Sequence, residues 1–264
     1  MRTYADVFKN AQGAALIPFF VLGDPTPEAS VELICAAVEA GADVLELGVP
    51  FSDPVADGPT IQRADIRSLE QGVNVNKAFE LIHQVKQRHD TPIGLLMYYN
   101  LIVHYGVEKF YKDAAAAGVN SVLVADLCVD DADEVLKHNR NNGLDTVFMV
   151  TPNTSIARRQ KIAQLCSGFI YTVSLLGVTG ARTELSQAVL PLIKELKTLT
   201  KTPVCVGFGV SQPEHAATLA QAGADGVIVG SAVVSIIEKH LDNLPAARKE
   251  LVDFIAKLKT ACQR

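Results

Sequence analysis

Residues 40–49, Ala-Gly-Ala-Asp-Val-Leu-Glu-Leu-Gly-Val, contain the pattern from which the architecture of this chain follows. A helical pattern precedes them, the glycine is typical of a helix end, and the apolar run predicts a buried strand. Variants of this phrase recur at residues 117–124, 142–150 and 222–229. Repeated helix ends that lead into short apolar strands predict helices alternating with parallel strands.

The same pattern can be extended to the rest of the chain. Strands are predicted near residues 16–22, 44–48, 93–98, 121–125, 146–150, 168–173, 204–207 and 226–229. Helices are predicted between them, for example at residues 27–40, 76–88, 107–117, 130–141 and 185–199. We therefore predict an α/β fold, a single (β/α)8 TIM barrel over residues 1–264 with extra N-terminal and loop helices. An open doubly wound sheet is the alternative, but no G-x-G-x-x-G follows the first predicted strand.

The composition is that of an ordinary globular protein, with 264 residues, 48% hydrophobic and 20% charged, and a net charge of -5. Because the chain has no basic run and no Trp, we expect no nucleic-acid partner. The five cysteines are scattered, which favours reduced thiols in a cytoplasmic protein. The N-terminus lacks a signal-peptide core, and the longest apolar stretch, residues 226–237, is shorter than the roughly 20 residues of a membrane helix. We expect no membrane association.

Two acidic residues stand at the end of the second predicted strand. Glu46 interrupts an apolar run, and a carboxylate there is costly unless it is paired or has a chemical role. Asp57 lies on the following loop, which contains Pro50, Pro54 and Pro59. A purely structural acid is the alternative for Glu46, and a local turn or cap for Asp57. A buried acid followed by a second acid on a stiff loop is typical of an active site.

Other polar side chains fall where predicted strands end, which is the active-site face of such barrels. Tyr98 and Asn100 lie at the end of the strand at 93–98, and Asp126 at the end of the one at 121–125. Tyr171 lies within the strand at 168–173, where a core aromatic residue with a satisfied hydroxyl is the alternative. We expect these side chains to surround Glu46 and Asp57.

Glycines after the last two predicted strands favour a phosphate site. Gly207-Phe208-Gly209 follows one strand, and Gly230-Ser231 follows the other and opens a helix. Backbone N–H groups beside a helix N-terminus bind phosphate well, although a bare turn has the same residues. The long segment 174–184 is typical of either a lid or a surface loop.

The residues that are missing narrow the reaction. No predicted strand contains a lysine, which disfavours a Schiff-base aldolase. The histidines lie in helices or connections, so no metal site is predicted. What remains is acid–base chemistry by carboxylates on a phosphorylated substrate.

One stretch is similar to a family signature. Glu-Leu-Gly-Val-Pro-Phe-Ser-Asp-Pro at 46–54 and Ala-Asp-Gly-Pro-Thr-Ile-Gln at 56–62 resemble the tryptophan synthase alpha chain family. The resemblance runs over essentially the whole chain. It includes residues 23–25, 97–100, 125–127, 177–180 and 207–211. Val21, Cys128 and Leu175 depart from the residues usual in that family.

The resemblance implies a lyase that cleaves indole-3-glycerol phosphate to indole and D-glyceraldehyde 3-phosphate. It also implies a beta chain partner in an alpha2beta2 assembly, to which indole passes for joining to serine. Pyridoxal phosphate is expected in that partner, and no cofactor or metal in this chain. A stand-alone lyase, a phosphosugar isomerase or epimerase, and a regulatory subunit remain alternatives.

The resemblance also assigns residues. Glu46, Asp57 and Tyr171 would be catalytic, with Glu46 as the acid–base and Asp57 on the indole N–H. Three residues would form the wall of the indole pocket: Phe19, Leu96 and Tyr98. Four would hold the phosphate: Gly180, Gly209, Gly230 and Ser231. Thr179 and Arg182 would belong to the lid.

Overall fold

The computed structural model describes residues 2–173, 188–207 and 209–263. The strands are β1 (Ala15–Val21), β2 (Leu45–Gly48), β3 (Ile93–Met97), β4 (Ser121–Val124), β5 (Asp145–Thr146), β6 (Phe148–Val150), β7 (Ile170–Val173), β8 (Val204–Gly207) and β9 (Gly226–Val229). The helices are α1 (Tyr4–Asn10), α2 (Pro27–Glu39), α3 (Pro59–Glu70), α4 (Val75–Arg88), α5 (Tyr99–Tyr105), α6 (Val107–Ala117), α7 (Asp133–Asn141), α8 (Ile156–Leu165), α9 (Val189–Leu199), α10 (Pro213–Gln221), α11 (Ser231–Lys239) and α12 (Leu244–Ala261).

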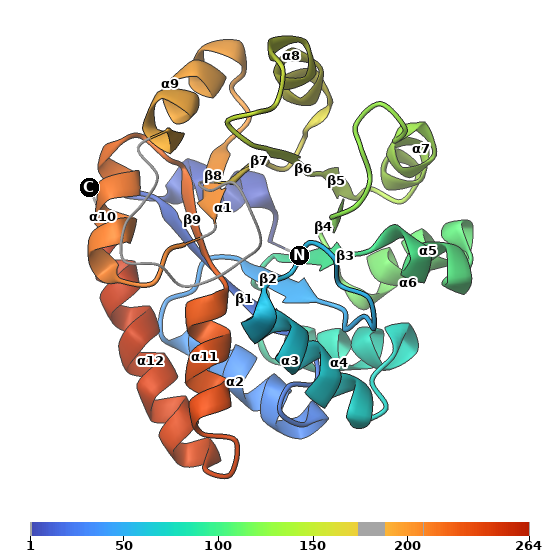
Figure 1. Ribbon diagram of the computed structural model, residues 1–264, viewed down its shortest axis with the longest axis vertical. Coiled ribbons are helices and arrows are strands. Elements are labelled where there is room, and N and C mark those ends of the chain that lie inside the picture. The colour runs from blue at the N-terminus through green and yellow to red at the C-terminus, as the bar shows by residue number, and fades with distance from the viewer. Residues whose placement is uncertain (1, 174–187, 208, 264) are drawn as a thin grey trace.

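All strand pairs are parallel, and the sheet runs in the order β5-β4-β3-β2-β1-β9-β8-β7-β6. β5 and β6 form the two ends of this order, yet only Val147 separates them in the chain. They are therefore two halves of one interrupted strand, and the sheet closes into a barrel ringed by helices (Figure 1). The predicted α/β barrel is confirmed, and the open sheet is excluded. The single-domain assignment of residues 1–264 stays a prediction.

In the repeated phrase, the glycine ends a helix and a strand follows, as the sequence predicted. Gly118 ends α6 in the left-handed conformation, with φ at 95°, and β4 begins at Ser121. Glycine serves best here because a side chain is strained at positive φ. The glycines of the other three copies also have positive φ: Gly41, Gly143 and Gly223.

Two hydrophobic cores follow from the alternation of side chains along each strand. In β1, Leu16 and Phe20 face the surrounding helices, while Ile17 and Phe19 point into the barrel. Both faces are buried, which is why the strand is apolar throughout. The inner core is small, so a polar group placed inside the barrel is removed from water.

The N-terminal end of the barrel is plugged by α1, which lies behind the strands in Figure 1. Tyr4 of α1 is buried in the inner core, and its hydroxyl and that of Ser121 are 2.7 Å apart. With this end closed, the opposite end remains for a site. The expected extra N-terminal helix is α1, and extra helices occur in loops, as α3 and α5, although their ranges were not predicted.

Some predicted boundaries were wrong. Glu46 is the second residue of β2 rather than its end, and Tyr98 follows β3 as the N-cap of α5. Pro59 belongs to α3 instead of the loop, because proline suits the first turn of a helix, where its missing N–H has no acceptor. The helix predicted at 130–141 begins at Asp133.

Candidate active site

Glu46 lies inside the barrel and is 5% exposed. Its neighbours Leu45 and Leu47 face the helices, so the alternation of β2 turns Glu46 inward. Burial raises the pKa of Glu46 to about 8, the nearby charge of Asp57 adds to this, and a hydrogen bond from Tyr171 opposes it. A carboxyl group with that pKa holds its proton near neutral pH and can donate it.

Tyr171 lies in β7, across the barrel from β2, and is buried in the inner core. Its hydroxyl donates to Glu46, and its pKa is raised well above its ordinary value, first by burial and then by Glu46 and Asp57. Gly207 makes room for the ring, because a Cβ there would lie 2.6 Å from the Tyr171 hydroxyl. Tyr171 is therefore a neutral donor fixed against the inner acid.

Asp57 is held on the loop between β2 and α3 and is 8% exposed. The Tyr98 hydroxyl donates to its Oδ2 at 2.7 Å, and the Asp57 carbonyl accepts from Gln62 Nε2 at 2.8 Å. Burial raises the pKa of Asp57, while the hydrogen bond from Tyr98 works in the other direction. The Ala56 amide donates to the same Tyr98 hydroxyl at 3.0 Å, which fixes the loop.

Aromatic and aliphatic side chains surround the two acids. Phe19 pairs with Glu46 across β1 and β2, and Leu96 of β3 pairs with Gly48. Both side chains belong to the inner core. The Tyr98 ring, also buried, lies 5.0 Å from the ring of Phe51. Phe19, Leu96 and Tyr98, the three residues predicted to line an apolar pocket, are therefore all buried.

The glycines after β8 and β9 lie at a turn and at a helix N-terminus. Gly209 has a φ of 82°. Gly230 is the N-cap of α11, makes no side-chain cap, and is followed by Ser231 at the first helical position. The first N–H groups of a helix have no acceptor within it and face outward from its N-terminus. Gly180, Thr179 and Arg182 lie outside the described residues.

Two of the polar residues predicted at the strand ends do not join this cluster. Asn100 and Asp126 are exposed. Asp126 accepts from the Tyr99 amide at 2.8 Å, so it caps the first turn of α5. A carboxylate that receives a helix N-terminal amide has a local structural role.

Sequence reasoning missed a third buried acid, Asp65 of α3, which is 5% exposed. Burial and the charge of Asp57 raise its pKa to about 8, while the Phe51 amide opposes this. It also missed an ion-pair cluster of Asp24, Arg67 and Glu238. Asp65 shares the buried stripe of α3 with Ile61, Ala64 and Ser68, but an acid at that spacing looks like a surface residue in the sequence.

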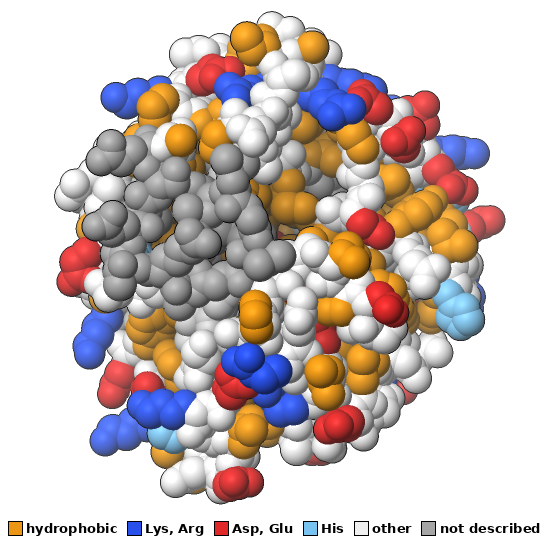
Figure 2. All heavy atoms as spheres, in the orientation of Figure 1, with side chains coloured by type: hydrophobic (Ala, Val, Ile, Leu, Met, Phe, Trp, Pro, Cys, Tyr) orange, Lys and Arg blue, Asp and Glu red, His pale blue; other side chains and the backbone are white. Residues whose placement is uncertain are grey.

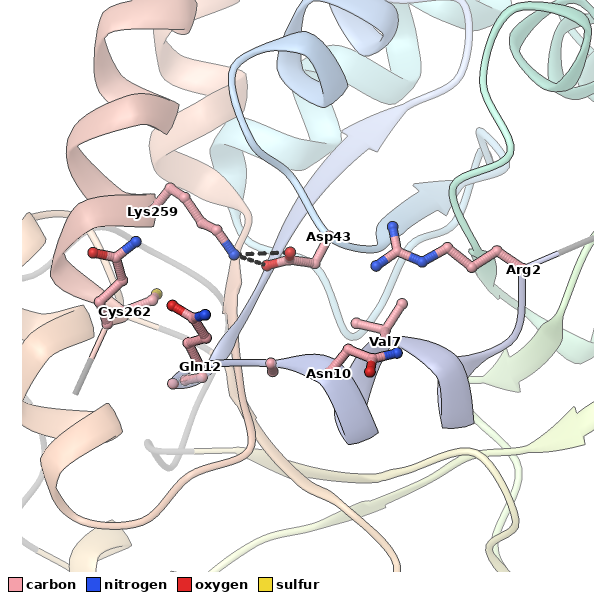
Figure 3. A pocket seen from close by; sticks show the side chains of 11 residues that line it. Arg2, Val7, Asn10, Gln12, Asp43, Lys259 and Cys262 are labelled. Atoms are coloured by element: carbon pink, nitrogen blue, oxygen red, sulfur yellow. Dashed lines mark hydrogen bonds and ion pairs between the residues drawn. The ribbon is translucent and has the colours of Figure 1, made fainter.

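A separate cavity of about 240 Å³ lies at the N-terminal end of the barrel (Figure 3). Lys259 of α12 donates to Asp43 at 2.6 and 2.8 Å, and the Leu16 amide donates to the same carboxylate at 2.7 Å. Beside this cavity, the contact between Lys259 and Asp43 joins the C-terminal helix α12 to the barrel.

The face seen in Figure 2 has its charged side chains mainly around the periphery, with hydrophobic and uncharged groups toward the middle, beside the grey residues. Among the described residues, no group of three or more His, Cys, Asp or Glu could hold a metal ion. The arrangement instead provides a protonated acid, an ionisable acid and an apolar wall. Such an arrangement can donate and accept protons beside an apolar surface.

Comparison with known proteins gives consistent matches. A sequence model of the family described as tryptophan synthase alpha chain matches residues 6–263. The tryptophan synthase alpha chain of Methanothermobacter thermautotrophicus is 46% identical, over 98% of this chain and 96% of that protein. A Mycobacterium tuberculosis tryptophan synthase structure has a TM-score of 0.90 at 36% identity, over 99% of this chain and 98% of that one. A chain of the Pyrococcus furiosus tryptophan synthase α2β2 complex has a TM-score of 0.87 at 40% identity, over 93% and 98%.

Proposed function

Since the chain belongs to the tryptophan synthase alpha chain family, we propose that it cleaves indole-3-glycerol phosphate to indole and D-glyceraldehyde 3-phosphate, with Glu46 and Asp57 as its working carboxyl groups. The observation that carries this assignment is Glu46 itself. It is a buried acid with a pKa of about 8, held between the Tyr171 hydroxyl and an apolar wall. That is the state in which a carboxyl group can give a proton to carbon.

Glu46 moves two protons. In its neutral form it protonates C3 of the indole ring, which turns the ring into a leaving group. Its carboxylate then accepts the proton of the glycerol hydroxyl next to the ring. The bond between C3 and the glycerol carbon breaks, its electron pair returns to the ring, and the hydroxyl carbon becomes the aldehyde. The acid ends protonated, as it began.

Asp57 stabilises the intermediate charge. Protonation at C3 places positive charge on the indole nitrogen, and a carboxylate that accepts the N–H stabilises that charge in a site poor in water. The hydrogen bond from Tyr98 favours the ionised form of Asp57 and aims its carboxylate. Tyr171 holds Glu46 in place and lines the pocket, whose walls are Phe19, Leu96 and Tyr98.

The phosphate is bound at the other end of the substrate, by the turn at Gly209 and the N-terminus of α11 at Gly230 and Ser231. Backbone N–H groups and the helix dipole favour a dianion there. Gly180 is assigned to the same site from the family resemblance, and Thr179 and Arg182 to a lid over it.

The partner is a beta chain in an α2β2 assembly, because the similar Pyrococcus furiosus chain belongs to a tryptophan synthase α2β2 complex. Pyridoxal phosphate belongs to that partner, and the chemistry assigned to this chain uses its own carboxyl groups. No helix of the described residues has the length and apolar character to span a membrane. A cytoplasmic location belongs to the same proposal.

The test is an indole-release assay with indole-3-glycerol phosphate, run with and without a tryptophan synthase beta chain. We expect slow turnover alone and a large increase with the partner. Fast turnover alone would instead identify a stand-alone lyase. No indole under either condition, together with epimerisation or isomerisation of a phosphosugar, would identify the other reaction class considered for this barrel.

Glu46→Gln tests the residue assignment in the same assay. The variant keeps the size and loses the transferable proton, so we expect turnover to fall by about 10³-fold or more while substrate still binds. Asp57→Asn is the companion variant, which keeps Glu46 and loses the charge opposite the indole nitrogen. Substantial turnover by Glu46→Gln would contradict the acid–base role.

A further inference from the structure

Arg67 of α3 forms contacts with two acids that come from distant parts of the chain. Its Nε and Nη2 donate to the two carboxylate oxygens of Asp24 at 2.7 and 3.0 Å. Its Nη1 donates to Glu238 Oε1 at 3.1 Å. Arg63 also donates to Glu238, at 2.6 and 2.8 Å, from a more exposed position. One guanidinium group therefore joins three segments with fixed geometry.

Each of these segments leads directly into the proposed active site. Asp24 follows β1, the strand that carries Phe19. Arg67 lies on α3, which begins immediately after Asp57 and Gly58. Glu238 lies on α11, whose N-terminus at Ser231 is assigned to the phosphate. The guanidinium thus connects the indole wall, the second acid and the phosphate site.

The cluster is built to fix position more than to add stability. Asp24 is 1% exposed and the Arg67 side chain 17% exposed, so both have lost much of their hydration. Burial raises the pKa of Asp24 even though Arg67 pairs with it. Buried ion pairs of this kind often add little net stability, while their bidentate geometry restricts how the segments can sit.

Neighbouring contacts stiffen the same junction. Ser68, next to Arg67, donates from its hydroxyl to the Leu22 carbonyl at 2.5 Å, and the Gly23 amide donates to Ser30 Oγ at 3.0 Å. Gly23 has a φ of 88°, and a Cβ there would lie 2.4 Å from Val73 Cγ2. The end of β1 is therefore clamped between α2 and α3, and the guanidinium extends this clamp to α11.

We propose that Arg67 is a positioning residue that holds the Asp57 segment and the phosphate-binding end of α11 at the spacing that the substrate needs. The inference rests on the proposed function. A substrate with an indole at one end and a phosphate at the other must satisfy both segments at once. Misplacement of about 1 Å between two such groups can cost about 100-fold in rate.

The distinctive consequence concerns ligands that occupy only one end. Indole contacts only the pocket of Phe19 and Asp57, and glycerol 3-phosphate contacts only the glycine turns. If Arg67 sets the spacing between the two ends, its replacement weakens the binding of a ligand that spans them. The binding of indole alone or of glycerol 3-phosphate alone stays almost unchanged. A defect at one end of the site, or a general loosening of the fold, would also weaken the binding of at least one half-ligand.

The experiment compares wild type with Arg67→Lys and Glu238→Gln. Lysine keeps the charge but cannot hold Asp24 at two points and Glu238 at a third. Glu238→Gln removes the negative charge that Arg67 and Arg63 contact on α11, which weakens this link, and it leaves the contact between Arg67 and Asp24 in place. Arg88→Lys is the matched control, because Arg88 forms a two-point pair with Glu32 between α2 and α4, away from the site.

Four quantities are measured for each protein: kcat/KM for indole release and the Kd values of indole-3-propanol phosphate, indole and glycerol 3-phosphate. Indole-3-propanol phosphate spans both ends but lacks the reacting hydroxyl. For Arg67→Lys we expect kcat/KM to fall about 10- to 100-fold and the spanning analogue to bind correspondingly more weakly, with each half-ligand within about 3-fold of wild type. Glu238→Gln should show the same pattern more weakly, and Arg88→Lys none of it.

Two results would overturn the inference: unchanged kcat/KM and analogue affinity in both variants, or half-ligands weakened as much as the spanning analogue. Failure of the proposed function gives a different result. In that case wild type binds the analogue but releases no indole, and the analogue affinities still decide the role of Arg67. If wild type binds neither the analogue nor its halves, both proposals are wrong.

Discussion

Three carboxyl groups are buried near one another's segments, those of Glu46, Asp57 and Asp65, and the charge of Asp57 raises the pKa of the other two. Burial raises the pKa of all three, and like charges at short distance cannot all form. Glu46 and Asp65 both have a pKa of about 8, so both are protonated near neutral pH. The Tyr98 hydroxyl donates to Asp57 and favours its ionised form, so the proposed mechanism assigns the negative charge to Asp57.

This distribution of protons predicts a bell-shaped pH profile for indole release. The reaction needs Asp57 ionised and Glu46 protonated, so kcat/KM should rise with pH as Asp57 loses its proton and fall as Glu46 ionises at about 8. The measurement is kcat/KM against pH at constant ionic strength. Activity that stays level well above that pH would contradict a protonated Glu46.

Tyr98→Phe provides the control for this assignment, because it changes one limb of the profile. The hydrogen bond from Tyr98 lowers the pKa of Asp57, so its loss should move the acid limb to higher pH and leave the alkaline limb in place. We also expect a fall of about 10-fold or more at neutral pH. A shift of the alkaline limb alone would show that the limbs had been assigned the wrong way round.

Asp65→Asn separates stability from catalysis. A carboxyl group whose pKa is 3.8 when unfolded and about 8 when folded binds more protons in the folded state. The loss of folding stability that this group causes is absent below pH 3.8, grows as the pH rises and is complete above about pH 8. The Asn variant, which can still accept from the Phe51 amide, should therefore gain on the order of a few kcal/mol over wild type at alkaline pH. Urea denaturation at several pH values measures this, and an equal gain at acidic pH would contradict it.

Among the elements, α3 shows what local sequence could and could not predict. The strands were predicted because glycine helix ends and apolar runs are local signals. α3 was not predicted, because its buried stripe includes Asp65 and Ser68, which look like surface residues. Their partners come from elsewhere: Ser68 donates to the Leu22 carbonyl, and Asp65 accepts from the Phe51 amide. Polar burial of this kind depends on tertiary contacts that the pattern of one helix cannot reveal.

Between β1 and β2, close approach depends on Gly48. A Cβ at this position would lie 2.7 Å from Phe19 Cζ and 3.0 Å from Cε2, so the Phe19 ring must move. Gly48→Ala should therefore deform the proposed indole wall, weaken indole binding by about 10-fold and cost roughly 1–3 kcal/mol of stability. Titration with indole and with glycerol 3-phosphate separates the two ends of the site. Equal weakening of both ligands, or of neither, would contradict the effect on Phe19.

For the whole molecule, sequence predicted the ring of strands but not the long-range clusters that fix its loops. The interruption between β5 and β6 did not disturb the prediction, because the strand predicted at 146–150 spans it. The contacts of Arg67 could not be predicted, since its partners are 43 and 171 residues away in the chain. The roles of Glu46 and Asp57 were suggested by their neighbours in sequence, whereas the role of Arg67 becomes visible only in three dimensions.

The two ends of the barrel should respond differently to mutation, since the acids lie at one end and the contact between α12 and Asp43 at the other (Figure 3). Lys259 is about one-third exposed and its Asp43 partner less so, so solvent screens the pair only in part. Lys259→Met keeps the aliphatic stem and removes the charge, and should cost roughly 1 kcal/mol of unfolding free energy. Because Asp43 retains the Leu16 amide, β1 should stay in register and kcat/KM should stay within about 2-fold of wild type.

Lys257→Met is the matched control, since Lys257 is exposed on the same helix, and it should change neither quantity. Urea denaturation and the indole-release assay on the same preparations decide the matter. A large loss of kcat/KM in Lys259→Met without loss of stability would mean that the N-terminal end communicates with the acids. That outcome would contradict a division of the barrel into a stabilising end and a catalytic end.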